Sequence, residues 1–240
     1  MSLTGTVVLI AGGSGALGRT VTPSFARAGA RVITTDRDPP PDEIAAGNAM
    51  KGDVTDEAAV RRLVDDVIRT AGRLDVLVNL VGGFAMGPVV ETDLSLWQRM
   101  LTMNVTSAFL LSKAVLPHMM ERGTGRILHV AAWAAVEPFP GAAAYLVSKS
   151  SLLALIRVLA LELKGSGVTV NGVLPTTIDT PANRANMPKA DPSSWARPES
   201  IAETLLFLAS AAGDQINGAA IPIGTQGRMK SETSLGMETR

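Results

Sequence analysis

The sequence predicts a single α/β domain, built on a doubly wound parallel sheet of about seven strands with helices on both faces. Short runs rich in Val, Ile and Leu alternate along the chain with longer segments of helical apolar spacing. The short runs are almost continuously apolar, which is typical of parallel strands covered on both faces. A glycine-rich loop directly follows the first run, and the length of 240 residues suits one such domain.

Each predicted element follows from its local pattern. Runs of apolar and β-branched residues predict strands at 6–10, 31–35, 48–51, 76–80, 126–130, 169–174 and 219–223. Apolar residues at helical spacing predict helices at 18–29, 56–71, 94–121, 145–164 and 199–211. The proline-rich segment after the sixth strand predicts a substrate lid at about 181–198, and 230–240 is expected to be a polar tail. The domain is expected to span residues 1–240.

Composition excludes several functional classes. Lys+Arg and Asp+Glu are balanced at 22 each, so no overall field favours nucleic acid or an anionic membrane. The absence of Cys excludes disulfide scaffolds and thiol nucleophiles, and the two His have no metal-ligand spacing, so we expect no metal. The chain shows no signal-peptide pattern and no uninterrupted apolar span of about 20 residues. We therefore expect a cytoplasmic protein that acts on a small molecule, without nucleic-acid or membrane partners.

The loop Ala11-Gly-Gly-Ser-Gly-Ala-Leu-Gly18 lies between the first predicted strand and the first predicted helix. Gly13, Gly15 and Gly18 match the pattern G-x-G-x-x-G. In this context the tight turn lets backbone N–H groups and the helix N-terminus contact a pyrophosphate, as in a Rossmann-type dinucleotide site. The candidate cofactor-binding residues of the loop are Gly12, Ser14, Gly15, Leu17 and Gly18.

Asp36 ends the second predicted strand, 18 residues after Gly18. A carboxylate at that place accepts hydrogen bonds from ribose hydroxyls and repels a 2′-phosphate, which favours NAD(H). Arg37 leaves NADP(H) open as a second choice. The loop is also one residue away from a Walker A motif, with Arg19 in place of the lysine. A nucleoside triphosphatase is the weaker interpretation, because no second strand ends in an acid suited to hold magnesium.

Tyr145 and Lys149 are four residues apart at the start of a predicted helix, so they share one face. A nearby ammonium favours phenolate over phenol and lowers the pKa of a tyrosine from ~10 towards the working pH. The pair therefore predicts a general acid/base.

These patterns together resemble the short-chain dehydrogenase/reductase family over roughly residues 4–224. The resemblance rests on the glycine loop, Asp36, the Tyr-x-x-x-Lys pair and three further motifs, namely Asp53-Val54, Asn79-Leu-Val-Gly82 and Met103-Asn-Val. It implies hydride transfer with a nicotinamide cofactor on one Rossmann-type domain, and a homodimer or homotetramer.

The resemblance also implies a role for each matching position. Tyr145 would transfer the proton, Lys149 would contact the ribose and tune Tyr145, and Asn104 would hold a proton-relay water. The further cofactor-binding positions that it implies are Asp53, Val54, Asn79, Pro175, Ile178 and Thr180.

The sequence departs from the family pattern at several places. Ala11 and Ala16 stand in the loop where Thr and Gly are usual, and Ala132 stands where the family has its catalytic Ser. Loss of such a hydroxyl donor typically costs about 10²–10³ in rate. Thr176 and Leu80 replace the usual Gly after Pro175 and Asn after Asn79.

Some of these departures resemble quinonoid dihydropteridine reductases, a resemblance that continues through the lid from Leu174 to Trp195. Such a reductase reduces a flat, imine-like ring, and Phe84, Trp133 and Trp195 are candidate substrate contacts. Two alternatives stay open. One is a carbonyl or alcohol oxidoreductase acting on a 3-oxoacyl compound or a small ketone or alcohol. The other is a catalytically silent NAD-binding sensor or scaffold.

Overall fold

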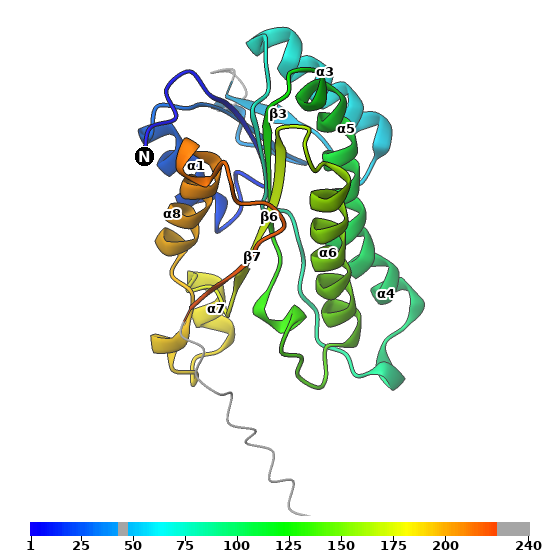
Figure 1. Cartoon of the computed structure of the whole chain (residues 1–240). Coiled ribbons are helices and arrows are strands. Elements are labelled where there is room, and N and C mark those ends of the chain that lie inside the picture. Colours follow the sequence, from blue (N-terminus) through cyan, green and yellow to red (C-terminus); the bar gives the residue numbers. More distant parts are fainter. Residues whose placement is uncertain (43–47, 225–240) are drawn as a thin grey trace, which may run out of the picture.

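The computed structural model describes residues 1–42 and 48–224, which form a seven-stranded parallel sheet flanked by helices (Figure 1). The strands are β1 (Val7–Ala11), β2 (Arg31–Asp36), β3 (Ala49–Lys51), β4 (Val76–Asn79), β5 (Gly125–Val130), β6 (Val168–Pro175) and β7 (Ala220–Ile223). Their order in the sheet is β3-β2-β1-β4-β5-β6-β7. The predicted fold class is confirmed. The predicted tail at 230–240 lies outside the described residues.

Helices cover both faces of the sheet. The helices α1 (Gly18–Arg27) and α8 (Pro198–Ala209) lie on one face, and α3 (Glu57–Ala71), α5 (Ser107–Glu121) and α6 (Ala143–Glu162) lie on the other (Figure 1). The shorter helical elements are α4 (Leu94–Leu101), α7 (Pro181–Asn186), and the single turns η1 (Val89–Glu91), η2 (Thr102–Thr106), η3 (Trp133–Ala135), η4 (Pro192–Ser194) and η5 (Ala211–Gly213).

The alternation of side chains along each strand produces two cores. On β1, Val7 and Leu9 join the core beneath α3, α5 and α6, whereas Val8 and Ile10 join the core beneath α1 and α8. All four side chains are buried. A strand buried on both faces needs apolar residues at consecutive positions, which is why these strands were recognisable in the sequence.

One prediction about the helices needs correction, and the segment predicted as a lid contains a helix. The predicted helix at 94–121 is divided into α4 and α5 by the π-helical turn Thr102–Thr106. The predicted lid contains a helix, α7, whose start follows the N-cap rules, because Thr180 accepts a hydrogen bond from the Asn183 backbone and Pro181 occupies the first turn.

Two helical stretches, Leu94–Glu121 and Ala143–Glu162, are long and apolar enough to cross a membrane by length and composition alone. Core helices of soluble proteins pass the same test. In this fold both stretches lie against the sheet, and Leu111 and Ile156 are fully buried there.

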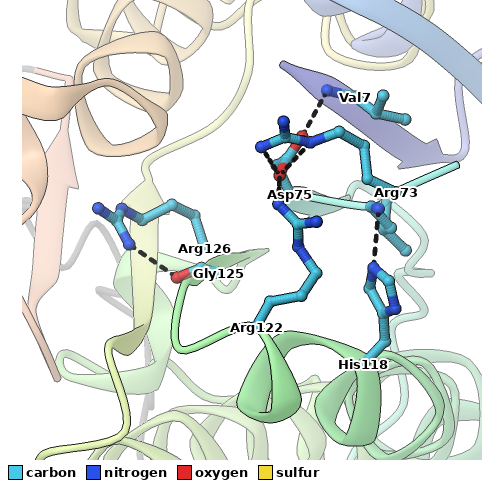
Figure 2. Close-up of polar contacts among 8 residues, drawn as sticks. Val7, Arg73, Asp75, His118, Arg122, Gly125 and Arg126 are labelled. Atoms are coloured by element: carbon cyan, nitrogen blue, oxygen red, sulfur yellow. Dashed lines mark hydrogen bonds and ion pairs between the residues drawn. The ribbon is translucent and has the colours of Figure 1, made fainter. Parts of the chain in front are cut away.

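A buried carboxylate fastens the edge of the sheet where the strands begin (Figure 2). Asp75 is 9% exposed and accepts the backbone N–H of Val7 at 2.9 Å. Arg73 donates Nε and Nη2 to the same carboxylate at 2.8 and 2.6 Å, and Arg122 at the end of α5 donates at 3.4 Å. The Asp75 carbonyl accepts the N–H of Arg126 on β5. One side chain therefore links β1, β4 and α5.

Asp75→Asn is expected to lower the free energy of unfolding by about 1.5–3 kcal/mol, the usual value of hydrogen bonds to a charged group. Thermal unfolding followed by circular dichroism should show a melting temperature lower by roughly 3–12 °C for a domain of this size. The control is Asp38→Asn, which breaks an ion pair with Lys51 whose side chains are 87% and 70% exposed, and it should change little. Equal shifts in the two variants would contradict the assigned role of Asp75.

Candidate active site

The predicted site residues gather at one edge of the sheet. Because all strands are parallel, their carboxyl ends lie at the same edge. Asp36, Asn79 and Pro175 are the last residues of β2, β4 and β6, and the glycine loop follows β1. β2 and β4 lie on opposite sides of β1. The connections that leave β1 and β4 therefore run to opposite sides of the sheet. Open α/β sheets bind ligands in the crevice outside the strand ends at such a point.

The glycine loop needs its glycines because of close backbone approaches. Gly12 has a φ of +87°, a conformation that favours glycine. A Cβ on Gly18 would collide with the carbonyl oxygens of Gly12 and Gly13, and one on Gly13 would lie 2.5 Å from Thr34 Cγ2. The loop thus lies tightly between β2 and α1, and Leu17, at the start of α1, is buried.

The first turn of α1 carries no acidic side chain. Leu17 at the N-cap provides no side-chain hydrogen bond. The positive end of the helix dipole is therefore not neutralised by the helix's own first turn, as in anion-binding helix termini.

Asp36 contacts the loop directly. Its Oδ2 accepts the backbone N–H of Ser14 at 3.0 Å and the Ser14 hydroxyl at 2.8 Å. Both residues are half-buried. The structure therefore brings together two of the cofactor positions that the sequence predicted.

Asp53 and Val54 follow β3 at the same edge. Asp53 Oδ1 accepts the Thr55 hydroxyl at 2.6 Å and the Thr55 backbone N–H at 2.9 Å, and these bonds hold the pKa of Asp53 below its usual value. Val54 is buried. Asp53 is thus kept as an oriented, ionised carboxylate.

Tyr145 and Lys149 lie in the first turns of α6. Lys149 is 6% exposed, and its Nζ donates to the Val130 carbonyl at 3.0 Å. Burial lowers the pKa of Lys149 to about 8 and raises the pKa of Tyr145 to about 12. The predicted net lowering of the Tyr145 pKa is therefore not found in this structure, because desolvation of the phenol dominates. A neutral phenol is the proton-donating form.

Asn104 connects three segments around this pair. It is fully buried in the π-helical turn, where Ser107 N–H donates to the Thr102 carbonyl five residues earlier. Its side chain accepts Gly83 N–H at 2.9 Å and donates to the Gly83 carbonyl at 3.0 Å and to Ser148 Oγ at 2.9 Å. π turns often mark functional sites.

Two positions that the sequence did not single out belong to this cluster. Ser148 Oγ donates to the Tyr145 carbonyl at 2.7 Å, and its place on the same helix between Tyr145 and Lys149 was the available signal. A Cβ on Gly82 would lie 2.7 Å from Asn104 Oδ1 and 3.1 Å from Lys149 Nζ. Gly82 therefore leaves the space that these two side chains occupy.

Asn79 lies beneath the site rather than on its surface. It is 2% exposed, and its Oδ1 accepts Val81 N–H at 3.0 Å. Its Nδ2 faces His129 Nδ1 at 3.4 Å. The Asn79 side chain therefore supports the backbone that follows β4 from below.

The three aromatic candidates differ in their surroundings. The Phe84 ring meets the Tyr145 ring edge-on, with centroids 4.8 Å apart, and is 58% exposed. Trp133 is half-buried, and its Nε1 donates to Glu137 Oε2 at 2.8 Å. Trp195 is only 9% exposed, which leaves little of its surface for a substrate. Phe84 is thus the candidate that the structure places at Tyr145.

The segment after β6 is fixed by Asn183. Its Nδ2 donates to the Ile178 carbonyl at 2.8 Å, and its backbone N–H donates to Thr180 Oγ1 at 3.2 Å. Pro175 and Thr180 are buried. Ile178 and Thr180 therefore lie in a turn that is held by these hydrogen bonds, after the carboxyl end of β6.

At the end of β5, Ala132 has an extended backbone and is 6% exposed. The site thus has no hydroxyl at the usual serine position. Among residues 1–42 and 48–224, no three His, Cys, Asp or Glu side chains lie together as a metal site.

Comparisons with known proteins show relatives that cover nearly the whole chain. A family model described as enoyl-(acyl carrier protein) reductase matches residues 11–224. D-threitol dehydrogenase of Mycolicibacterium smegmatis is 33% identical over 239 residues, which cover 92% of this chain and 92% of that protein. A crystal structure described as a short-chain dehydrogenase/reductase of Burkholderia xenovorans has a TM-score of 0.85 and 32% identity, covering 92% of this chain and 96% of that one. The structure of 3-ketoacyl-(acyl-carrier-protein) reductase from Brucella melitensis, solved with NADH, has a TM-score of 0.83 and 28% identity, covering 93% and 98%.

Proposed function

The chain belongs to the short-chain dehydrogenase/reductase family of oxidoreductases, and on that premise we propose that it transfers hydride between NAD(H) and a small organic substrate, with Tyr145 as the proton donor or acceptor. The observation that carries the proposal is the gathering of Tyr145, Asn104 and Lys149 at the carboxyl edge of the sheet. Asn104 donates to Ser148 Oγ, which donates to the Tyr145 backbone carbonyl. Lys149, one turn along the same helix, is held by the Val130 carbonyl, and a Cβ on Gly82 would approach both Lys149 Nζ and Asn104 Oδ1.

The residues at this edge suit a nicotinamide dinucleotide. The close approach at Gly18 and the uncapped start of α1 make room for a pyrophosphate. Asp36 would accept hydrogen bonds from the adenosine ribose, and Asp53 and Val54 would border the adenine. The cofactor supplies or takes the hydride. At the other end of the cofactor, Lys149 would contact the ribose, and Ile178 and Thr180 would meet the carboxamide.

In the reductive direction, Tyr145 donates a proton to the atom that becomes negative as the substrate accepts hydride. Its raised pKa keeps the phenol protonated at neutral pH. Lys149 retains most of its positive charge at pH 7 with a pKa of about 8, and this charge stabilises the phenolate that proton transfer leaves behind. Asn104 would hold the water that returns the proton. Such general acid catalysis contributes about 10²–10⁴ in rate.

Ala132 favours a particular class of substrate. Reduction of a ketone builds negative charge on oxygen, and a hydroxyl donor normally stabilises that charge. A quinonoid dihydropterin is an imine-like acceptor that develops less oxyanion character, so the absent hydroxyl costs less there. Phe84 and Trp133 would lie against the flat ring. We propose dihydropterin reduction as the first candidate activity, beneath a lid formed by about 181–198.

A carbonyl or alcohol oxidoreductase is the second candidate, favoured by the similarity to D-threitol dehydrogenase. Rates of NADH oxidation with freshly generated quinonoid dihydropterin, a small ketone and a 3-oxoacyl thioester distinguish the two. A higher kcat/KM for the pterin supports the first candidate. A higher kcat/KM for either carbonyl compound overturns it in favour of the second.

Asp36→Ala is expected to lower the preference for NADH over NADPH by about 10-fold or more, because it removes a charged acceptor for the ribose hydroxyls and a repulsion of the 2′-phosphate. The measurement is the dissociation constant of each cofactor from its fluorescence. Asp38→Ala, at a nearby carboxylate that is 87% exposed, is the control and should leave the preference unchanged. An unchanged preference in Asp36→Ala would mean that Arg37, and not Asp36, selects between the two cofactors.

We also propose that the protein is a cytoplasmic homodimer or homotetramer. The support is a set of exposed apolar side chains on the outer faces of α5 and α6, namely Phe109, Met120, Val147, Val158 and Leu161. Sedimentation equilibrium measures the assembly directly, and a monomer would contradict the proposal.

A further inference from the structure

His129 is a buried titratable side chain that the proposed mechanism does not use. It lies in β5, is fully buried, and faces the same layer as α5. Its Nε2 lies 3.1 Å from Ser112 Oγ, and its Nδ1 lies 3.4 Å from Asn79 Nδ2. The ring therefore stands between α5 and the end of β4.

The surrounding hydrogen bonds assign the tautomer of His129. Ser112 Oγ donates its proton to the Ala108 carbonyl at 2.8 Å, so its lone pairs accept from His129 Nε2–H. The unprotonated Nδ1 then accepts a hydrogen bond from the Asn79 amide. Burial, with a smaller contribution from the Lys149 charge, lowers the pKa of His129 to about 4. The ring is therefore neutral near pH 7, and Nδ1 remains an acceptor.

The bond to His129 fixes the orientation of the Asn79 amide, which in turn bonds the backbone. With Nδ2 directed to His129, its Oδ1 faces Val81 N–H and accepts it at 3.0 Å. Two residues later, Asn104 holds both polar groups of the Gly83 backbone. An asparagine side chain thus holds each end of the segment 81–83 by hydrogen bonds.

Gly82 lies between these two bonded residues, beside the candidate catalytic residues Asn104 and Lys149. A Cβ there would lie 2.7 Å from Asn104 Oδ1 and 3.1 Å from Lys149 Nζ. The two side chains therefore occupy the space beside Gly82, and a movement of its backbone towards them would crowd them. Misplacement of catalytic groups by about 1 Å can cost roughly 10² in rate.

We propose that His129 is a positioning residue, which sets the places of Lys149 and Asn104 by orienting Asn79 and so fixing the segment 81–83. This inference rests on the proposed function for its effect on turnover. The route is a chain of hydrogen bonds from Ser112 through His129 and Asn79 to Val81.

The two ring nitrogens allow a test, because Asn and Gln each mimic one of them. His129→Asn carries an amide oxygen near the place of Nδ1 and keeps the acceptor for Asn79. His129→Gln carries its amide near the place of Nε2 and keeps only the partner of Ser112. His129→Leu keeps neither. All three should lower the melting temperature, since each disturbs a buried site.

Turnover should depend on whether a variant keeps a hydrogen-bond acceptor at the place of Nδ1, and not on its melting temperature. His129→Asn is expected to keep kcat within about 3-fold of wild type, and His129→Gln and His129→Leu to lower it about 10-fold. If kcat instead falls in step with the melting temperature in all three variants, His129 only fills the core and the inference is overturned.

A second readout does not depend on turnover. The titration of Lys149, followed by NMR of ¹³C-labelled lysine, should match wild type in His129→Asn and shift in His129→Gln and His129→Leu. An unchanged Lys149 titration in all three variants overturns the inference. A wild-type protein that oxidises no NADH with any substrate defeats the proposed function instead, and the Lys149 titration then decides the role of His129 alone.

Discussion

Tyr145→Phe is expected to lower substrate-dependent NADH oxidation by about 10²–10⁴-fold, the usual contribution of a general acid. The substitution removes only the hydroxyl. The ring that meets Phe84 edge-on at a centroid distance of 4.8 Å remains, so the packing between the two rings is kept. Steady-state rates at saturating NADH and substrate measure the effect, and NADH fluorescence verifies that the cofactor still binds.

Ser150→Ala is the matched control for this variant. Ser150 lies on the same helix, and its hydroxyl makes one long bond of 3.3 Å to the Ala135 carbonyl, away from Lys149 and Asn104. We expect its turnover to stay within about 2-fold of wild type, as for a surface substitution that leaves the site intact. Undiminished turnover in Tyr145→Phe would show that another group transfers the proton. Absence of turnover in wild type itself would instead favour the alternative of a silent binding protein.

Gly82→Ala is expected to lower kcat by about 10²-fold, because the added methyl displaces catalytic groups. The methyl would lie 2.7 Å from Asn104 Oδ1 and 3.1 Å from Lys149 Nζ, and both side chains are held by other hydrogen bonds that resist movement. The backbone of Gly82 has no positive φ, so the conformation itself accepts alanine. The measurement is kcat together with the melting temperature.

Gly87→Ala separates this effect from a general intolerance of the segment. Gly87 also has no positive φ, and its added methyl would lie 3.0 Å from Thr92 Oγ1 and 3.4 Å from Leu96 Cδ2, outside the candidate site. We expect it to keep kcat within about 3-fold of wild type. Similar losses in both variants would mean that Gly82 serves the fold and not the positions of Asn104 and Lys149.

The fold was predictable because its signals are local. Strands buried on both faces give apolar runs such as Val7–Ala11, and these runs alternate with helical spacing. The π turn at Thr102–Thr106 was not predictable in this way. It changes the hydrogen-bond register without changing the apolar spacing of the helices around it.

The site was predictable in its location and less so in its electrostatics. Asp36, Tyr145 and Lys149 could be located from motifs, because parallel strands bring their carboxyl ends to one edge. The direction of the Tyr145 pKa shift depends on burial of the phenol, and the place of Lys149 depends on its bond to the Val130 carbonyl, 19 residues earlier in the chain. The placement of Asn79 beneath the surface depends on His129 and Val81. Such contacts are set by tertiary packing and leave no trace in residue spacing.

The most direct test of the central claim is the stoichiometry of a wild-type reaction. NADH oxidised and substrate reduced are measured in the same mixture, with quinonoid dihydropterin and then with the ketone and the 3-oxoacyl thioester. The proposed hydride transfer predicts equal amounts of oxidised cofactor and reduced product for at least one substrate, and no oxidation without substrate. Bound NADH that none of these substrates oxidises, or NADH lost without a reduced product, would contradict it.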